Sequence, residues 1–343
     1  MNLAELNTIA QAMVTPGKGI LAADESSGTI KKRFDAIGAA STADSRRDYR
    51  ELLFRSLDAM SGRISGVILY DETIRQTARD STPLVRLIEQ TGSIPGIKVD
   101  KGTKPLPFCP GEVVTEGLDG LRERFVEYRG LGAKFAKWRA VIDIGPGIPT
   151  ETCIACNAHA LARYAALSQE EGIVPIVEPE VLQDGTHTIG RSEKVTSRVL
   201  DAVYTELFDQ RVDLAGTILK PNMVLSGYEA SSRASVEEVA KQTLHCFYKH
   251  VPAAVPGIAF LSGGQSDEDA TAHLNAMNAS GPHPWQLSFS YGRALQAPAL
   301  KAWGGKPENV EAAQRAYYHR AKLNSAARTG MYAPAMEQEL ATA

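Results

Sequence analysis

The chain has 343 residues, of which 43% are hydrophobic and 22% are charged, with a formal net charge of −3. This is the composition of an ordinary globular protein, and without a basic excess neither nucleic acid nor an anionic membrane is an expected partner. No apolar run approaches the roughly 20 residues that span a bilayer. The first ten residues carry no basic leader and four cysteines make no disulfide framework, so we expect a cytoplasmic protein with reduced thiols.

Eight short apolar segments, rich in β-branched residues, recur along the chain and predict strands at 19–23, 64–70, 96–99, 135–143, 173–177, 216–219, 257–261 and 286–290. Helical patterns lie between them, at 44–60, 118–131, 149–169, 192–208, 235–248, 267–277 and 307–326. Strand alternating with helix predicts a parallel sheet, and eight such units predict a closed (β/α)8 TIM barrel. An open doubly wound sheet is the alternative, but no strand is followed by Gly-x-Gly-x-x-Gly.

Two segments depart from this alternation. Residues 101–117, which are rich in Pro and Gly, predict a long loop after the third strand. Residues 329–343 lack a clear apolar face and predict a mobile C-terminal tail. No linker or low-complexity tract divides the chain, so residues 1–343 are expected to form a single barrel domain.

Polar and charged side chains follow the predicted strands, at the carboxyl ends where (β/α)8 barrels carry their functional groups. In chain order they are Asp24-Glu25, Asp71-Glu72, Lys98 and Asp100, Lys137 and Arg139, Glu178 and Glu180, Lys220 and Asn222, Ser262-Gly-Gly-Gln265, and Ser290-Tyr-Gly-Arg293. Residues two apart in a strand share one face. Charges of both signs inside a barrel are unfavourable as plain core, so they predict one polar site, with a ring of structural ion pairs as the alternative.

Lys220 is the most informative of these residues. It follows a buried, β-branched run and precedes a proline, in Thr217-Ile-Leu-Lys-Pro-Asn-Met-Val224. An ammonium buried there is costly unless something uses it, and an uncharged lysine amine condenses with carbonyl groups. The sequence therefore predicts Schiff-base chemistry at Lys220, although a lysine that pairs with a carboxylate or reaches the barrel rim is the alternative.

Neighbouring charges can serve that chemistry. Lys137 can act electrostatically on Lys220. Glu178 or Glu180 can move the protons needed to form and dehydrate a carbinolamine, and Asp24 can be the base toward a substrate hydroxyl.

Two stretches predict anion binding. The first is Ser262-Gly-Gly264 together with Gly292-Arg293, because barrels often bind phosphate after their last two strands. The second is Ser26-Ser-Gly-Thr29, which opens a helix beside Lys32 and Arg33. We expect the two sites at opposite edges of one mouth, which suits a substrate phosphorylated at both ends.

With these residues in view, the chain resembles the class I, metal-independent fructose-bisphosphate aldolases. The matching segments are Gly19-Ile-Leu-Ala-Ala-Asp-Glu-Ser26, Gly66-Val-Ile-Leu69, Gly96-Ile-Lys-Val-Asp-Lys-Gly102, Phe135-Ala-Lys-Trp-Arg139, Gly172-Ile-Val-Pro-Ile-Val-Glu-Pro-Glu180, Leu219-Lys-Pro-Asn-Met-Val224, Phe260-Leu-Ser-Gly-Gly-Gln265 and Phe289-Ser-Tyr-Gly-Arg-Ala-Leu-Gln296. The resemblance implies a barrel assembled as a homotetramer. It also implies reversible cleavage of fructose 1,6-bisphosphate to two triose phosphates in glycolysis and gluconeogenesis, with neither cofactor nor metal.

The resemblance also implies a role for each matching residue. Lys220 corresponds to the Schiff-base lysine, Glu178 to the proton acceptor, Lys137 to its electrostatic partner and Asp24 to the base at the C4 hydroxyl. One phosphate is implied at Ser262, Gly263, Ser290, Gly292 and Arg293, with Gly264 completing the turn. Contacts at the other end of the substrate are implied for Ser26, Thr29, Arg33 and Lys98, supported by Arg139 and Glu180.

Some choices stay open. Another Schiff-base sugar-phosphate aldolase, a transaldolase, or a non-catalytic barrel that binds phosphorylated sugars are the alternatives, and the order of preference among fructose 1,6-bisphosphate, fructose 1-phosphate and sedoheptulose 1,7-bisphosphate is not defined. Animal members end in a tyrosine that aids proton transfer, whereas the last tyrosine here is Tyr332. That role is therefore not transferred to the tail. Cys153-Ile-Ala-Cys156, with His159 nearby, has the spacing of a metal site but reads as helix core.

Overall fold

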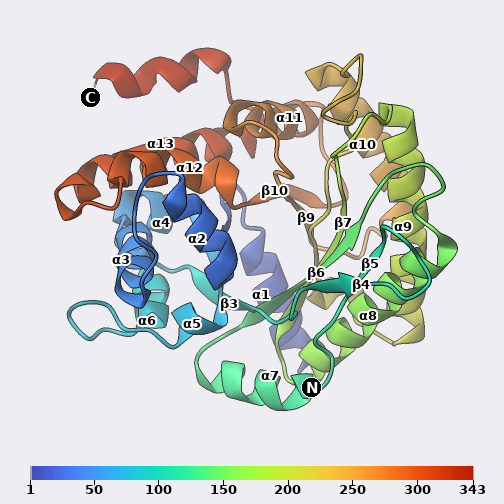
Figure 1. Cartoon of the computed structure of the whole chain (residues 1–343), viewed down its shortest axis with the longest axis horizontal. Coiled ribbons are helices and arrows are strands. Elements are labelled where there is room, and N and C mark those ends of the chain that lie inside the picture. Colours follow the sequence, from blue (N-terminus) through green and yellow to red (C-terminus); the bar gives the residue numbers. More distant parts are fainter. Residues whose placement is uncertain (1, 343) are drawn as a thin grey trace.

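The strands close into a parallel barrel. The computed structural model describes residues 2–342, and in it eight parallel strands close in the order β1-β10-β9-β8-β7-β6-β3-β2 (Figure 1). Their bounds are β1 (Gly19–Ala23), β2 (Ile64–Leu69), β3 (Ile94–Lys98), β6 (Phe135–Ile142), β7 (Val174–Val181), β8 (Ile218–Leu219), β9 (Gly257–Phe260) and β10 (Gln286–Tyr291). The (β/α)8 fold and all eight predicted strands are confirmed.

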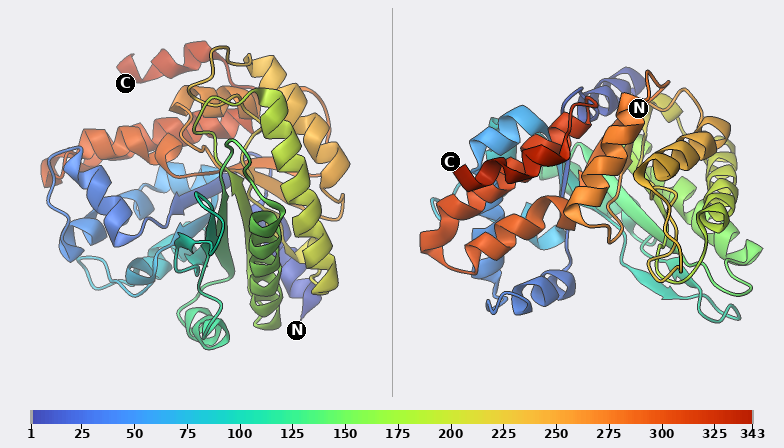
Figure 2. Two further views of the ribbon diagram at one scale, coloured as in Figure 1. Left: turned by 45° about the vertical axis from the view of Figure 1, so that its right-hand side comes forward. Right: turned by 90° about the horizontal axis from the view of Figure 1, so that it is seen from above.

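Helices surround the barrel, as the two views in Figure 2 show. They are α1 (Leu3–Met13), α2 (Ser27–Asp35), α3 (Ala43–Phe54), α4 (Leu57–Arg63), α5 (Asp71–Ile74), α6 (Leu84–Gln90), α7 (Leu121–Gly130), α8 (Glu151–Glu170), α9 (Ile189–Asp209), α10 (Val236–His250), α11 (Asp267–Ala279), α12 (Arg293–Trp303) and α13 (Val310–Ala327). Each predicted helical segment contains a helix. None of the helices among residues 2–342 is long and apolar enough to cross a membrane.

Two local expectations were wrong. The segment 44–60 is two helices, because the chain leaves helical geometry at Ser56 (φ −76°, ψ 77°), which caps α4. Leu57, which a continuous helix would place on the same face as Leu53, is instead the first residue of α4 and is 62% exposed. The predicted loop at 101–117 contains an antiparallel hairpin of β4 (Thr103–Pro105) and β5 (Val113–Thr115). The hairpin is held to α8 by Asn157, whose Nδ2 donates to the Val113 carbonyl at 2.9 Å.

An apolar layer fills the barrel interior toward the amino-terminal ends of the strands. Successive strand residues alternate between the two faces of a sheet, so one set of side chains points inward. This inner cluster contains Phe135, Val174, Ile176 and Ile218. Helix α1 contributes its buried face, Leu6, Ala10 and Met13, to the same cluster and so closes the amino-terminal end of the barrel.

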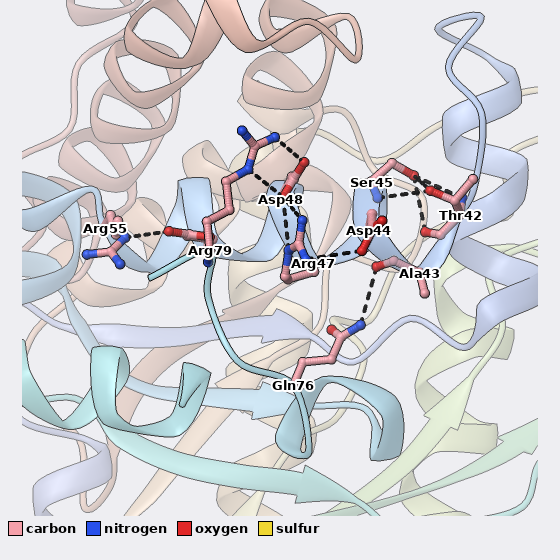
Figure 3. A network of polar contacts seen from close by, with 10 residues as sticks. Thr42, Ala43, Asp44, Ser45, Arg47, Asp48, Arg55, Gln76 and Arg79 are labelled. Atoms are coloured by element: carbon pink, nitrogen blue, oxygen red, sulfur yellow. Dashed lines mark hydrogen bonds and ion pairs between the residues drawn. The ribbon is translucent and has the colours of Figure 1, made fainter. Parts of the chain in front are cut away.

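An exposed ion-pair network lies on α3 (Figure 3). Its N-terminus has a capping box in which Thr42 and Ser45 satisfy each other's backbone amides. One turn further, Asp48 accepts from Arg47 at 2.7 Å and from Arg79, in the segment after α5, at 2.5 Å. These contacts tie α3 to the segment that precedes α6.

The segment predicted as a mobile tail contacts α13 within the described residues. Tyr332 is 8% exposed, and its hydroxyl donates to Glu337 Oε1 at 2.9 Å. Glu337 lies in a 3₁₀ helix, η3 (Pro334–Thr342), and pairs with Arg320 on α13 at 2.6 Å. Mobility of this segment stays a prediction, and Ala343 lies outside the described residues.

Candidate active site

The same alternation of strand faces also places charged side chains inside the barrel, next to the apolar layer and nearer the carboxyl ends of the strands. Phe135, Lys137 and Arg139 follow one another on the inner face of β6, and Val174, Ile176, Glu178 and Glu180 do so on β7. The register sets Arg139 opposite Glu178. The inner face therefore changes from apolar to charged toward the carboxyl ends of the strands.

Four charged side chains form a continuous chain at this level. Asp24 Oδ2 lies 2.7 Å from Lys137 Nζ. Lys137 Nζ lies 3.1 Å from Glu178 Oε2, and Glu178 Oε1 lies 3.1 Å from Lys220 Nζ. Lys137, Glu178 and Lys220 are 3–4% exposed. Glu178 therefore bridges two buried amines.

The protonation states follow from this arrangement. Burial by itself raises the pKa of the Glu178 carboxyl, but Lys137, Lys220 and Arg139 outweigh it and hold that pKa below its usual value. In the same way, burial opposes ionisation of Asp24, and Lys137 and Lys220 lower the pKa of Asp24 far below its usual value. Burial disfavours charge on Lys137, yet Asp24 and Glu178 raise its pKa. At neutral pH, two carboxylates therefore flank the Lys137 ammonium.

A cavity of about 790 Å³ opens above these charges at the carboxyl ends of the strands. Its lining includes fifteen of the sixteen predicted site residues, which are Asp24, Ser26, Thr29, Arg33, Lys98, Lys137, Arg139, Glu178, Glu180, Lys220, Ser262, Gly263, Ser290, Gly292 and Arg293. The exception, Gly264, adjoins the cavity, because a methyl group added to it would lie 3.3 Å from Nη2 of Arg293.

The two predicted anion sites are neighbours, so the expectation that they lie at opposite edges of the mouth was wrong. Closure of the barrel makes β1 and β10 adjacent. A methyl group added to Gly292, after β10, would lie 3.6 Å from Nη2 of Arg33, which stands on α2 after β1. The two stretches therefore border one side of the cavity.

Cations across the barrel supply a separate cationic edge. In the strand order, β6 lies opposite β10, and β3 lies opposite β9. Lys98 at the end of β3 pairs with Asp100, and Arg139 on β6 pairs with Glu180. Cationic side chains thus lie on both sides of the cavity, although Lys98 and Arg139 are each paired with a carboxylate, and Lys98 is grouped with Arg139 on the neighbouring strand rather than with Ser26 and Arg33.

Glu25 has a supporting position that the sequence analysis did not assign. Glu25 follows Asp24 just beyond the end of β1, and both residues line the cavity. Glu25 is buried, and its carboxylate pairs with both Arg33 and Arg50. It thereby fixes the guanidinium of Arg33 beside the cavity.

Two further predicted residues have clear positions. Ser290 is 1% exposed, and its Oγ has no hydrogen-bond partner within the described part of the chain, although the residue lines the cavity. Asn222 instead links the segment after β8 to the end of β7, because its Oδ1 accepts from the Val181 amide at 2.9 Å.

Cys153, in the Cys-x-x-Cys segment, is buried in α8, and burial raises the pKa of its thiol to about 12.

Comparison with known proteins agrees with this geometry. The family model of class-I fructose-bisphosphate aldolases matches residues 5–343. The chain belongs to the class-I fructose-bisphosphate aldolase family. It is 56% identical over 333 residues to a probable class 1 aldolase of Xanthomonas campestris pv. campestris, covering 97% of this chain and 99% of that protein. It is 54% identical over 330 residues to fructose-bisphosphate aldolase 1 of Toxoplasma gondii, covering 96% and 91%.

The fold comparison gives the same family. The structure of Plasmodium falciparum fructose-bisphosphate aldolase, solved with TRAP and a small-molecule inhibitor, superposes with a TM-score of 0.94 at 49% identity, covering 96% of this chain and 95% of that one. The activity of this class-I aldolase is the reversible cleavage of fructose 1,6-bisphosphate to dihydroxyacetone phosphate and glyceraldehyde 3-phosphate through a lysine Schiff base, in glycolysis and gluconeogenesis.

Proposed function

We propose that Lys220 is the lysine that forms the Schiff base and that Glu178, Lys137 and Asp24 carry the proton transfers. The observation that carries this proposal is the position of Glu178, whose two carboxylate oxygens each lie 3.1 Å from a buried amine. A carboxylate in that position can accept a proton from one amine while the other stays charged.

The steps follow from the positions of these groups. The Lys220 amine adds to the C2 carbonyl of the ketose, and Glu178 returns a proton to the departing water as the carbinolamine becomes a Schiff base. Asp24 takes the proton of the C4 hydroxyl, the C3–C4 bond breaks, and glyceraldehyde 3-phosphate leaves. The electron pair of that bond is held as an enamine on Lys220. Protonation of the enamine and hydrolysis release dihydroxyacetone phosphate.

The substrate phosphates take opposite sides of the cavity in this proposal. One is bound by Ser262, Gly263 and Gly264 together with Ser290, Gly292 and Arg293. The other reaches the edge that Lys98 and Arg139 form, with Glu180 holding Arg139 in place. Arg33 lies next to Gly292, and together with Ser26 and Thr29, which also line the cavity, it completes the first side. Charge on both sides suits a ketose with a phosphate at each end.

We also propose that the enzyme is a cytoplasmic homotetramer that uses no cofactor or metal. The acidic pI of about 6.2 and the free cysteines are compatible with that compartment. Size-exclusion chromatography with light scattering measures the subunit number directly.

Borohydride trapping tests the proposed nucleophile. The protein is treated with borohydride in the presence of dihydroxyacetone phosphate, digested and mapped by mass spectrometry. The expected result is irreversible loss of activity with one modified residue, Lys220, and turnover that is unchanged by EDTA. Modification of Lys137 or Lys98 instead, or loss of turnover in EDTA, overturns the proposal.

A further inference from the structure

The turn after β9 carries backbone amides toward the predicted phosphate, and its shape depends on residues outside the cavity. The Gln265 amide donates to the Ser262 carbonyl at 3.0 Å, which closes a β-turn. Its two central residues, Gly263 and Gly264, have φ values of +56° and +92°. Positive φ at both positions is the signature of a type I′ turn, which only glycine adopts without strain.

The first carbonyl of this turn, that of Ser262, is held by a side chain. Gln265 Nε2 donates to the Ser262 carbonyl at 3.0 Å. The other end of that amide, Oε1, lies 2.6 Å from Nδ1 of His273 on α11. Since Oε1 can only accept, His273 donates from Nδ1. Burial lowers the pKa of His273 to about 4, so the ring is neutral at physiological pH and carries its one N–H on Nδ1, toward Gln265.

The second carbonyl is fixed by a tyrosine. The Tyr228 hydroxyl donates to the Gly263 carbonyl at 2.7 Å. Burial raises the pKa of Tyr228 to about 12, so the hydroxyl keeps its proton at working pH. Tyr228 follows β8 and is not among the residues that line the cavity, and its ring lies beside Gly264.

A trans peptide points its N–H opposite to its C=O. Holding the Ser262 carbonyl therefore sets the direction of the Gly263 amide, and holding the Gly263 carbonyl sets that of the Gly264 amide. Neither amide donates to any other group in the described residues. Gly264 lies beside Arg293, because a methyl group added to it would be 3.3 Å from the Arg293 Nη2, and free amides beside a guanidinium suit an anion.

We propose that Tyr228 and the Gln265–His273 pair are positioning residues that aim the Gly263 and Gly264 amides at one phosphate of the substrate. This inference rests on the proposed function of the turn as a phosphate site. It assigns substrate affinity to three residues that contact neither the sugar nor the phosphate.

The test compares Tyr228→Phe with Tyr164→Phe. Both changes remove a hydroxyl that donates to a backbone carbonyl, but Tyr164 donates to Ile176 at 3.2 Å and does not line the cavity. For Tyr228→Phe we expect KM for fructose 1,6-bisphosphate to rise about tenfold with kcat within about twofold, equivalent to about 1.4 kcal/mol of binding. Tyr164→Phe is expected to leave both constants unchanged. An unchanged KM in Tyr228→Phe, or an equal rise in the two variants, overturns the inference.

Gln265→Glu provides an independent arm, because it keeps the side-chain shape but removes the donor to the Ser262 carbonyl. Borohydride trapping with dihydroxyacetone, which has no phosphate, is compared with trapping by dihydroxyacetone phosphate in each variant. We expect half-saturation to rise only for the phosphorylated ketone, and inhibition by inorganic phosphate to weaken. An equal change for both ketones overturns the positioning role, whereas absence of labelling at Lys220 in the unmodified enzyme overturns the proposed function instead.

Discussion

The protein has two groups of linked ion pairs, one on α3 and one at the barrel mouth, and they differ in how far their side chains are exposed to solvent. In the network on α3 (Figure 3), the Asp48 side chain is 21% exposed and that of Arg79 is 60% exposed, so both reach the solvent. In the chain from Asp24 to Lys220 at the barrel mouth, side-chain exposure does not exceed 12%. An exposed ion pair contributes about 0–1 kcal/mol to the free energy of unfolding. Moving an ion out of water into the protein interior costs several kcal/mol before its attraction to a partner is counted.

The comparison explains why the buried charges indicate function. An apolar set of side chains could fill the same volume at equal or greater stability. The charges at the barrel mouth instead place two buried amines 3.1 Å from the two oxygens of one carboxylate, which is the arrangement that the proposed Schiff-base chemistry requires. The α3 network provides only attachment between neighbouring segments.

The largest difference between the two regions is expected for removal of the amine. Lys220→Met should lower kcat on the order of 10⁴-fold or more, because the covalent path is lost. Lys31→Met is the matched control, since Lys31 forms an exposed pair with Asp35 at 2.7 Å and should retain full activity. Steady-state cleavage assays measure both. Substantial turnover by Lys220→Met would contradict the account.

Glu178→Gln is expected to have the next largest effect. The amide keeps the shape of the side chain but cannot accept a proton as a carboxylate does, so kcat should fall about 10²- to 10³-fold. Schiff-base formation, followed by stopped-flow trapping, should slow along with cleavage. Asp48→Asn serves as the control for removing a carboxylate that accepts from two cations. A comparable loss of turnover in both variants would remove the distinction between the two regions.

Asp24→Asn is expected to lower the free energy of unfolding by an amount that depends on pH. It leaves Lys137 without its partner at 2.7 Å, and breaking a buried pair costs about 3–5 kcal/mol. Because Lys137 and Lys220 lower the pKa of Asp24, its contribution is present above the ordinary value of 3.8 and is lost as the pH falls below that value. Urea unfolding should therefore separate wild type from Asp24→Asn at pH 7 and bring them together in acid. A gap that widens as the pH falls below 3.8 would contradict the assignment.

The smallest effect is expected on α3. Arg79→Ala removes a side chain that is 60% exposed, so the free energy of unfolding should change by about 0.5 kcal/mol or less. Cleavage should be unaffected. A loss above about 2 kcal/mol in urea unfolding would show that exposure does not separate the two regions.

The sequence predicted the barrel, and it predicted which charged side chains line one cavity, because both follow from alternation along strands. A strand that places Phe135 inward also places Lys137 and Arg139 inward, and this holds whatever the loops do. The same logic assigns Glu178 and Glu180 to one face. Eight repeats of this pattern leave little freedom in the fold.

What the sequence did not predict depends on contacts between distant segments. The grouping of Arg33 with Gly292 follows from closure of β1 onto β10, which no local pattern contains. The break at Ser56 interrupts a continuous helical periodicity. The support of the phosphate turn by Tyr228 joins the segments after β8 and β9. Each outcome is decided by packing rather than by residue preference.

A crystal structure of the protein soaked with fructose 1,6-bisphosphate tests the central claim most directly. The account predicts a covalent bond between Lys220 Nζ and C2 of the sugar, with Glu178 in contact with that nitrogen. One phosphate should lie on the turn from Ser262 to Gln265 beside Arg293. A sugar bonded to a different lysine, or held in the cavity with Lys220 unmodified and still paired to Glu178, would contradict it.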